Sequence, residues 1–209
     1  MHLAAARAAL ALCLAVASAS HAQDGPQDLQ KPRRARRVPD VMYIPTPHDV
    51  VGQMLDLAGV RKNDVVYDLG CGDGRIVVAA AKRFGCRAVG VDVDPLRIED
   101  ARRNVKENRL EHLVTIREGD LFQVDLSEAT VVTLYLSTRY NTRLIPQLDR
   151  MKPGSRVVSH LFGIQGAKPQ KLIQVASEAD EHKHALLLWT TPLAERAPTS
   201  QGQRPENRP

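Results

Sequence analysis

Three glycines and a more distant carboxylate have residue types and a spacing that suit a nucleoside-binding site. The glycines, at positions 70, 72 and 74, follow the apolar run Val65–Leu69 within the segment Asp68–Ile76 (DLGCGDGRI). Glycine allows a positive φ angle and lets a ligand lie against bare backbone, and the start of a following helix offers free N–H groups to an anion. Asp92 ends the next apolar run, 20 residues after Gly72. A carboxylate at that place can accept hydrogen bonds from both hydroxyls of a ribose.

The order of the glycines differs from two other nucleotide-binding patterns. A dinucleotide fingerprint needs glycine at position 75, where this chain has Arg75, and the third glycine here comes one residue earlier, at Gly74. A P-loop needs Gly-Lys followed by Ser or Thr, which this loop lacks. The first difference argues against a nicotinamide-dependent oxidoreductase, and the second excludes a P-loop nucleotide site.

Alternating strand-like and helix-like segments must position these residues. Apolar runs predict seven strands, at 65–69, 88–91, 114–117, 130–136, 156–159, 171–176 and 185–190. Helical patterns predict helices at 46–57, 75–84, 95–108 and 141–151, the first of them capped by Thr46. This alternation predicts a parallel sheet with helices on both faces. Residues 180–183 are expected to turn between the last two strands, which predicts an antiparallel hairpin at one edge.

The glycine loop and the acid after the second strand together resemble class I S-adenosylmethionine-dependent methyltransferases. Two further features extend this resemblance over residues 41–190. Gly119-Asp120 follows the third strand, where the family has its adenine-side acid, and a Lys-Pro-Gly turn (152–154) precedes the fifth strand.

A closer resemblance is carried by five short segments. These are YIPTP (43–47), DLGCGDGRI (68–76), GDLF (119–122), VVTLYL (131–136) and RVVSH (156–160). Together they are similar to the bacterial relatives of the ATP synthase c-subunit lysine methyltransferase family, which is distantly similar to the non-SET histone lysine methyltransferases. The resemblance suggests a protein lysine amine as the methyl acceptor.

The resemblance implies a doubly wound, mostly parallel seven-stranded sheet with an antiparallel edge hairpin, the Rossmann-like methyltransferase fold. It also implies S-adenosyl-L-methionine as the cofactor. The predicted cofactor-binding residues are Tyr43, Thr46, Asp68, Gly70, Gly72, Gly74, Asp92 and Asp120. The glycines would line the methionine half of the cofactor, and Asp68 would steady its ammonium group. Asp92 would bind the ribose, and Asp120 would lie on the adenine side. Tyr43 and Thr46 would close over the cofactor.

The methyl acceptor is expected beside the ends of the fourth and fifth strands. Tyr135, Ser137 and His160 lie at or just beyond these ends, where ligands bind in open α/β sheets. A buried His160 that only satisfies backbone groups is the alternative. The fourth strand lacks the Asp/Asn-Pro-Pro-Tyr motif of enzymes that methylate amino groups of nucleic acids, so no nucleic acid acceptor is expected. No general base is predicted.

The cysteines and histidines predict neither a disulfide nor a metal site. Cys71 and Cys86 flank the predicted helix 75–84, which is about 15 Å long at 1.5 Å per residue. A disulfide needs Cα atoms within roughly 7 Å, so both thiols are expected to be free. The chain has seven histidines, but no group of His, Cys and Asp has the spacing of metal ligands.

The ends of the chain are predicted to lie outside the methyltransferase domain, 41–190. Residues 1–22 have the basic start, the apolar stretch and the small residues before a cleavage site that are typical of a signal peptide. They predict a periplasmic or secreted protein, with organelle import or an uncleaved membrane anchor as alternatives. Residues 23–40 are expected to be a basic flexible linker, and residues 191–209 a disordered tail.

Length and charge limit the remaining alternatives. The 209 residues suffice for one domain with a sizeable core. Of the net charge of +5, only +1 falls on residues 39–209, so the basic composition does not indicate a nucleic-acid-binding face. A small-molecule methyltransferase and a non-catalytic module that binds S-adenosylmethionine both remain open, and the oligomeric state is not predicted.

Overall fold

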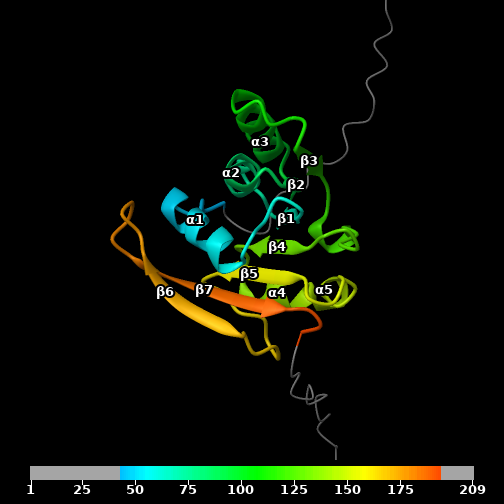
Figure 1. Ribbon diagram of the computed structural model, residues 1–209, viewed down its shortest axis with the longest axis vertical. Helices are drawn as coiled ribbons and strands as arrows, with labels where there is room; N and C mark the ends of the chain where they lie inside the picture. Colours follow the sequence, from blue (N-terminus) through cyan, green and yellow to red (C-terminus); the bar gives the residue numbers. More distant parts are fainter. Residues whose placement is uncertain (1–42, 194–209) are drawn as a thin grey trace, which may run out of the picture. The chain divides into compact units, whose positions relative to one another are not determined.

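Within the described residues, 43–193, seven strands form one mixed sheet in the order β3-β2-β1-β4-β5-β7-β6 (Figure 1). These residues belong to one compact unit of the computed structural model. The strands are β1 (Val65–Leu69), β2 (Arg87–Asp92), β3 (Val114–Glu118), β4 (Val131–Leu134), β5 (Arg156–His160), β6 (Lys171–Ala176) and β7 (Lys183–Thr190). The strands β1 to β5 are parallel, whereas β7 pairs antiparallel with β5 and β6. The predicted α/β fold with its edge hairpin is confirmed.

Helices cover both faces of the sheet. They are α1 (His48–Leu57), α2 (Arg75–Phe84), α3 (Pro95–Glu107), the 3-10 helix η1 (Leu121–Gln123), α4 (Thr138–Arg143) and α5 (Ile145–Leu148). Successive residues of a strand point to opposite faces. Val66 therefore belongs to the core under α1, α2 and α3, while Tyr67 belongs to the core that contains Leu144, between α4 and α5, and Leu148 of α5. This arrangement confirms that the sheet is doubly wound.

The direction of chain winding reverses between β1 and β4. From β1 the chain moves outward through β2 to β3, and it then returns to the other side of β1 as β4 (Figure 1). Ligands of open α/β sheets bind beyond the carboxyl ends of the strands at such a point. The glycine loop that links β1 to α2 lies at this place. Gly74 precedes α2 with a φ angle of 75°, and Gly85 follows it with a φ angle of 65°, so both bounds of this helix agree with the prediction.

Two predicted helices differ from the structure. Thr46 was expected to cap the first helix, but the N-cap residue of α1 is Pro47 and no side chain caps it. The Thr46 hydroxyl bonds to a buried histidine instead. The predicted helix 141–151 is replaced by α4 and α5, which meet at Leu144. Proline lacks the N–H group that a continuous helix needs and is tolerated in a first turn, so Pro146 lies in the first turn of a new short helix.

The predicted ends of the chain fall mostly outside the described residues. The predicted signal peptide, 1–22, and the linker, 23–40, lie there, as do residues 194–209 of the predicted tail. Thr191 and Leu193 are buried, and backbone hydrogen bonds join Thr191 to Gly154 and Ser155. The folded region therefore extends three residues past the predicted boundary at 190. No helix in the described part of the chain is long and apolar enough to cross a membrane.

Candidate cofactor and acceptor site

A cavity of about 370 Å³ lies where the carboxyl ends of β1, β2 and β4 meet the segment 43–46. This volume is within the range of roughly 300 to 1,000 Å³ that small-molecule sites occupy. The predicted site residues that line it are Tyr43, Thr46, Asp68, Gly70, Asp92, Tyr135 and Ser137. The structure therefore brings both halves of the predicted site, the cofactor side and the acceptor side, to one cavity.

Asp92 is held against the glycine loop by two backbone groups. The N–H of Gly72 donates to Asp92 Oδ2 at 2.9 Å, and the N–H of Asp94 donates to Asp92 Oδ1 at 3.0 Å. Each carboxylate oxygen has two lone pairs, so each can accept one further hydrogen bond. Because Asp92 also lines the cavity, both oxygens are available in principle to a pair of ribose hydroxyls.

The three glycines of the loop have different neighbours. All have positive φ angles, and Gly70 lines the cavity. Gly72 and Gly74 are not among the lining residues, and their place beside the methionine half of the cofactor stays a prediction. A Cβ atom on Gly72 would lie 2.1 Å from the ring of Tyr43, and one on Gly74 would lie 3.0 Å from Ala101 Cβ. These two glycines allow the segment 43–46 and α3 to pack closely on the loop.

Asp68 lies at the buried end of the cavity. Its Oδ1 atom accepts a hydrogen bond of 2.7 Å from the Thr133 hydroxyl. Burial raises the pKa of the Asp68 carboxyl to about 7, in spite of the Thr133 hydrogen bond, and the charges of Asp92 and Asp73 add to the rise. A cation in the cavity would favour the ionised carboxylate. Burial also raises the pKa of the neighbouring Cys71 thiol, which is therefore neutral and unsuited to nucleophilic attack.

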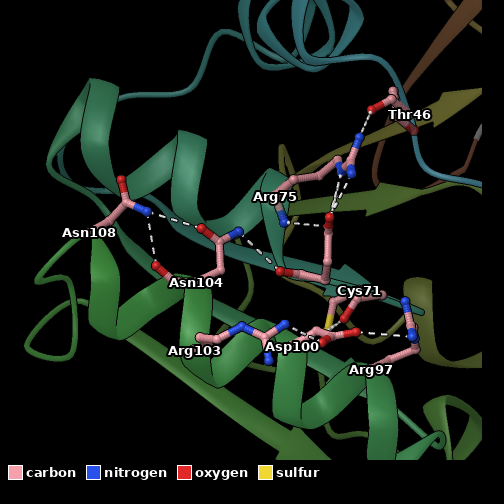
Figure 2. A network of polar contacts seen from close by, with 10 residues as sticks. Thr46, Cys71, Arg75, Arg97, Asp100, Arg103, Asn104 and Asn108 are labelled. Carbon is pink, nitrogen blue, oxygen red and sulfur yellow. Dashed lines mark hydrogen bonds and ion pairs between the residues drawn. The ribbon is translucent and has the colours of Figure 1, made fainter.

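Arg75 ties the segment 43–46 to the glycine loop. Figure 2 shows its guanidinium beside Thr46, whose carbonyl oxygen accepts a hydrogen bond of 2.9 Å from Arg75 Nη1. The same side chain donates to the Asp73 carboxylate through Nε and Nη2. Burial would raise the pKa of Asp73, but its hydrogen bonds to Arg75 and the charge of that residue outweigh this effect and lower it. Asn104 of α3 adds a hydrogen bond to the Asp73 carbonyl, so three chain segments meet at this loop.

Asp120 caps η1 and is not among the cavity-lining residues. Its Oδ1 atom accepts a hydrogen bond of 3.0 Å from the N–H of Phe122. The next residue, Leu121, does line the cavity. Phe122 stacks on Tyr140 with ring centroids 5.6 Å apart, and it is the Tyr140 ring that lines the cavity. The adenine-side role of Asp120 stays a prediction.

The acceptor side of the cavity is aromatic. The ring centroid of Tyr135 lies 4.1 Å from that of His160 and 6.1 Å from that of Phe162. Tyr135, Ser137 and Phe162 line the cavity, but His160 is fully buried behind it. His160 bonds to two side chains, Thr46 and His184, rather than to backbone groups. Burial, with a smaller contribution from the charge of His184, lowers the pKa of His160 to about 4, so the imidazole is neutral near pH 7.

Comparison with known proteins decides the family. Residues 68–171 match the ANTKMT methyltransferase domain family. A protein-lysine N-methyltransferase from Saccharolobus islandicus (strain REY15A) is 47% identical over 154 residues, which make up 73% of this chain and 94% of that relative. The chain belongs to this methyltransferase family.

Solved structures agree with this assignment. An RNA methyltransferase from Salinibacter ruber, solved in complex with S-adenosyl-L-homocysteine, is 44% identical to this methyltransferase. The match has a TM-score of 0.66 and covers 77% of this chain and 100% of that one. A geranyl diphosphate C-methyltransferase from Streptomyces coelicolor A3(2) is only 17% identical, with a TM-score of 0.56 over 71% of this chain and 78% of the other. That second likeness shows the fold alone.

The methyltransferase uses S-adenosyl-L-methionine, and its cavity fits that cofactor. The fit rests on complementary groups at separate places: a buried carboxylate at Asp68, exposed backbone at Gly70, and the doubly anchored Asp92. Among residues 43–193, no group of three His, Cys, Asp or Glu side chains could hold a metal ion. Cys71 and Cys86 are free buried thiols, as expected.

Several residues of the site were not predicted. Asp73 lies in the glycine loop and Arg75 directly follows it. Tyr140 and Phe162 come soon after β4 and β5. All four line the cavity, and their places in the sequence could have indicated this. His184 gave no such signal. It meets His160 only because β7 pairs antiparallel with β5, with Leu186 opposite His160.

Proposed function

We propose that this methyltransferase methylates the ε-amine of lysine residues in a protein. The observation that carries the proposal is the 47% identity to a protein-lysine N-methyltransferase that this chain covers almost completely. The aromatic acceptor side supports it. A lysine amine must be neutral to act as a nucleophile, and apolar surroundings disfavour its charged form.

The exposed rim of the cavity supports a large acceptor. Phe162 lines the cavity and is 38% exposed, and its neighbour Leu161 is 40% exposed. Exposed apolar side chains beside a cavity can contact a protein surface while one side chain enters. Trp189, by contrast, is buried in the core and donates a hydrogen bond to the Ala167 carbonyl, so it does not contribute to this rim.

The reaction is a direct transfer. When bound, S-adenosyl-L-methionine would supply an electrophilic methyl group on its sulfonium to the amine nitrogen. The protein contributes alignment and exclusion of water. Asp68, Gly70 and Asp92 would hold the donor, while the aromatic rings beside Tyr135 would limit the directions from which an amine can approach.

The test is labelled methyl transfer from S-adenosylmethionine by the full chain into three substrate pools: cellular protein, total RNA and small molecules. We expect label in protein, and methyl-lysine in peptide mass spectra. The matched control is the variant Asp92→Ala, which should give much less label at a cofactor concentration near the wild-type Kd. Label confined to RNA would contradict the proposal and favour the activity named for the Salinibacter ruber relative. Label confined to small molecules would also contradict it.

We further propose that residues 1–22 direct the methyltransferase out of the cytoplasm. The support is in the sequence: Arg7, the 13-residue stretch 8–20 and the small residues Ser20 and Ala22. Mass spectrometry of the native protein should find an N-terminus at Gln23. A native protein that keeps Met1 or His2 in a cytoplasmic fraction would contradict export.

A further inference from the structure

Four hydrogen-bonded side chains connect the cavity to the protein surface. Thr46 lines the cavity, and its hydroxyl lies 3.1 Å from His160 Nδ1. His160 Nε2 lies 2.7 Å from His184 Nδ1, and His184 Nε2 lies 3.0 Å from Asp180 Oδ1. The first three side chains are buried, whereas Asp180 is exposed in the turn between β6 and β7. The row therefore has one end in the cavity and the other in solvent.

The exposed carboxylate sets the direction of every hydrogen bond in the row. The hydrogen bond from His184 lowers the pKa of Asp180, so its carboxylate is ionised and can only accept. His184 Nε2 must then carry the proton, which leaves Nδ1 of a neutral His184 as an acceptor. His160 therefore donates through Nε2 and accepts through Nδ1. The Thr46 hydroxyl donates to His160, and its oxygen keeps its lone pairs free to accept a hydrogen bond from the cavity.

We propose that Thr46, His160, His184 and Asp180 form a proton relay that removes a proton from the acceptor ammonium group before methyl transfer. The inference rests on the proposed amine acceptor. One N–H bond of the ammonium breaks as its proton moves to Thr46 Oγ1, and the hydroxyl proton of Thr46 moves to His160 Nδ1. The proton on His160 Nε2 moves to His184 Nδ1, which becomes an imidazolium beside the Asp180 carboxylate. Solvent at the exposed turn then takes one proton, and the amine nitrogen keeps the electron pair that attacks the methyl group.

A purely structural row would behave differently. The same hydrogen bonds join the segment before α1 to β5 and to the β6–β7 hairpin, so their loss lowers stability in either case. Only a relay makes the effect on kcat depend on whether the acceptor amine arrives charged or neutral. The titratable groups facing the two histidines are Tyr135 and Asp180, and the charge of His182 acts on Asp180. None of these residues is changed in the test.

The first measurement needs no acceptor. Two-bond ¹H–¹⁵N correlation spectra of the full chain at pH 7.5, assigned with His160→Gln and His184→Gln, report which ring nitrogen carries the proton. We expect both histidines to be protonated at Nε2. A proton on Nδ1 of His160 would make Thr46 the acceptor and would overturn the relay.

The second measurement is a pH profile of kcat with saturating cofactor. Thr46→Val should lower kcat at pH 7 by roughly 100-fold, the lower end of the usual contribution of general acid–base catalysis. The deficit should shrink near pH 9.5, because more of a lysine with a pKa of about 10.4 then arrives neutral. Thr46→Ser, which keeps the hydroxyl, should stay close to the wild type across the profile.

Thr191→Val is the matched control. It also removes a buried hydroxyl, which donates to the Lys152 carbonyl. Thr191 follows the end of β7, whereas His184 lies near the start of that strand, so Thr191→Val should leave the shape of the pH profile unchanged. An equal deficit of Thr46→Val at pH 7 and pH 9.5, or no deficit, would overturn the relay. A wild-type protein that forms no methyl-lysine would overturn the proposed function and the relay with it, whereas the tautomer result can overturn the relay alone.

Discussion

Asp68 and Asp92 are two carboxylates of one cavity with opposite surroundings. Asp92 is oriented by hydrogen bonds from two backbone N–H groups. Asp68 is buried, receives one hydroxyl hydrogen bond, and has its pKa raised to about 7. The first is suited to accept hydrogen bonds from neutral hydroxyls, and the second gains most from a cationic group. This difference supports the predicted roles, with the ribose at Asp92 and the ammonium at Asp68.

Cofactor affinity should therefore depend on pH through Asp68. The folded-state pKa is raised, so the carboxyl of the free protein becomes protonated as the pH falls below about 7. A cation binds the ionised form, and below pH 7 binding must first displace that proton. We expect the Kd for S-adenosylmethionine to rise between pH 7.5 and 5.5, approaching about tenfold per pH unit at the low end. Isothermal titration calorimetry at several pH values measures this change in Kd.

Asp68→Asn is the control for this dependence. It should bind S-adenosylmethionine more weakly at pH 7.5, because the amide carries no negative charge, and its Kd should change little down to pH 5.5. Parallel curves for the two proteins would show that another group causes the dependence.

At the scale of elements, the glycine loop is shaped as much by its neighbours as by a ligand. Gly72 is covered by the Tyr43 ring, and the guanidinium of Arg97 lies 4.8 Å above that ring. Gly90 of β2 is similarly close, because a Cβ there would lie 2.9 Å from Cys71 Sγ. The segment 43–46 can therefore pack on the loop only because Gly72 has no side chain, and β2 can pack against Cys71 only because Gly90 has none.

Gly72→Ala should displace the segment 43–46. The added Cβ would lie 2.1 Å from the Tyr43 ring, and the φ angle of 52° adds roughly 1–2 kcal/mol of backbone strain. We expect weaker cofactor binding and a lower urea midpoint. In a double-mutant cycle with Tyr43→Ala, the two losses of binding energy should be less than additive because they share one contact. Additive losses would contradict the packing role of Gly72.

The elements were largely predictable, and their ends and tertiary contacts were not. Apolar runs located all seven strands, and glycines marked both ends of α2. The predicted capping role of Thr46 was wrong. A helix cap bonds an N–H group nearby in the sequence, whereas the Thr46 hydroxyl bonds to His160, which is 114 residues away in the sequence. Asp180 was predicted only as part of a turn, because the register of β7 against β5 that brings it to the relay is a property of the whole sheet.

At the scale of the whole molecule, the two ends of the sheet have separate tasks. The cavity lies at the carboxyl ends of the strands. At the amino end, Arg156 of β5 donates to Asp64 Oδ2 at 2.7 Å and to the Ala58 carbonyl, and Thr130 donates to Asp64 Oδ1 at 2.7 Å. This network joins the end of α1, the start of β1 and the start of β5, so its contribution should be to stability.

Arg156→Met should destabilise the fold without changing cofactor affinity. Burial would raise the pKa of Asp64, but the hydrogen bonds from Arg156 and Thr130 lower it below its usual value. A depressed pKa stabilises the fold above the unfolded value near 4 and loses that contribution as the pH falls through the folded value. Because Arg156 is partly exposed, we expect a loss of about 1–2 kcal/mol at pH 7, and a smaller loss near pH 3. Urea unfolding at both pH values tests this, and an equal loss at both would contradict the ionic contribution.

The central claim is that the backbone of the glycine loop and the Asp92 carboxylate together bind S-adenosylmethionine, the loop along its methionine half and Asp92 at its ribose. The most direct measurement is calorimetric titration of this cofactor into the wild-type protein and into Asp92→Ala, with Asp125→Ala as the control. Asp125 is exposed and bonds only within its own turn to Ser127. Loss of hydrogen bonds to a charged group costs about 1.5–3 kcal/mol, so the Kd of Asp92→Ala should rise roughly 10- to 100-fold while that of Asp125→Ala stays at the wild-type value. Equal affinity of Asp92→Ala and the wild type would contradict the account.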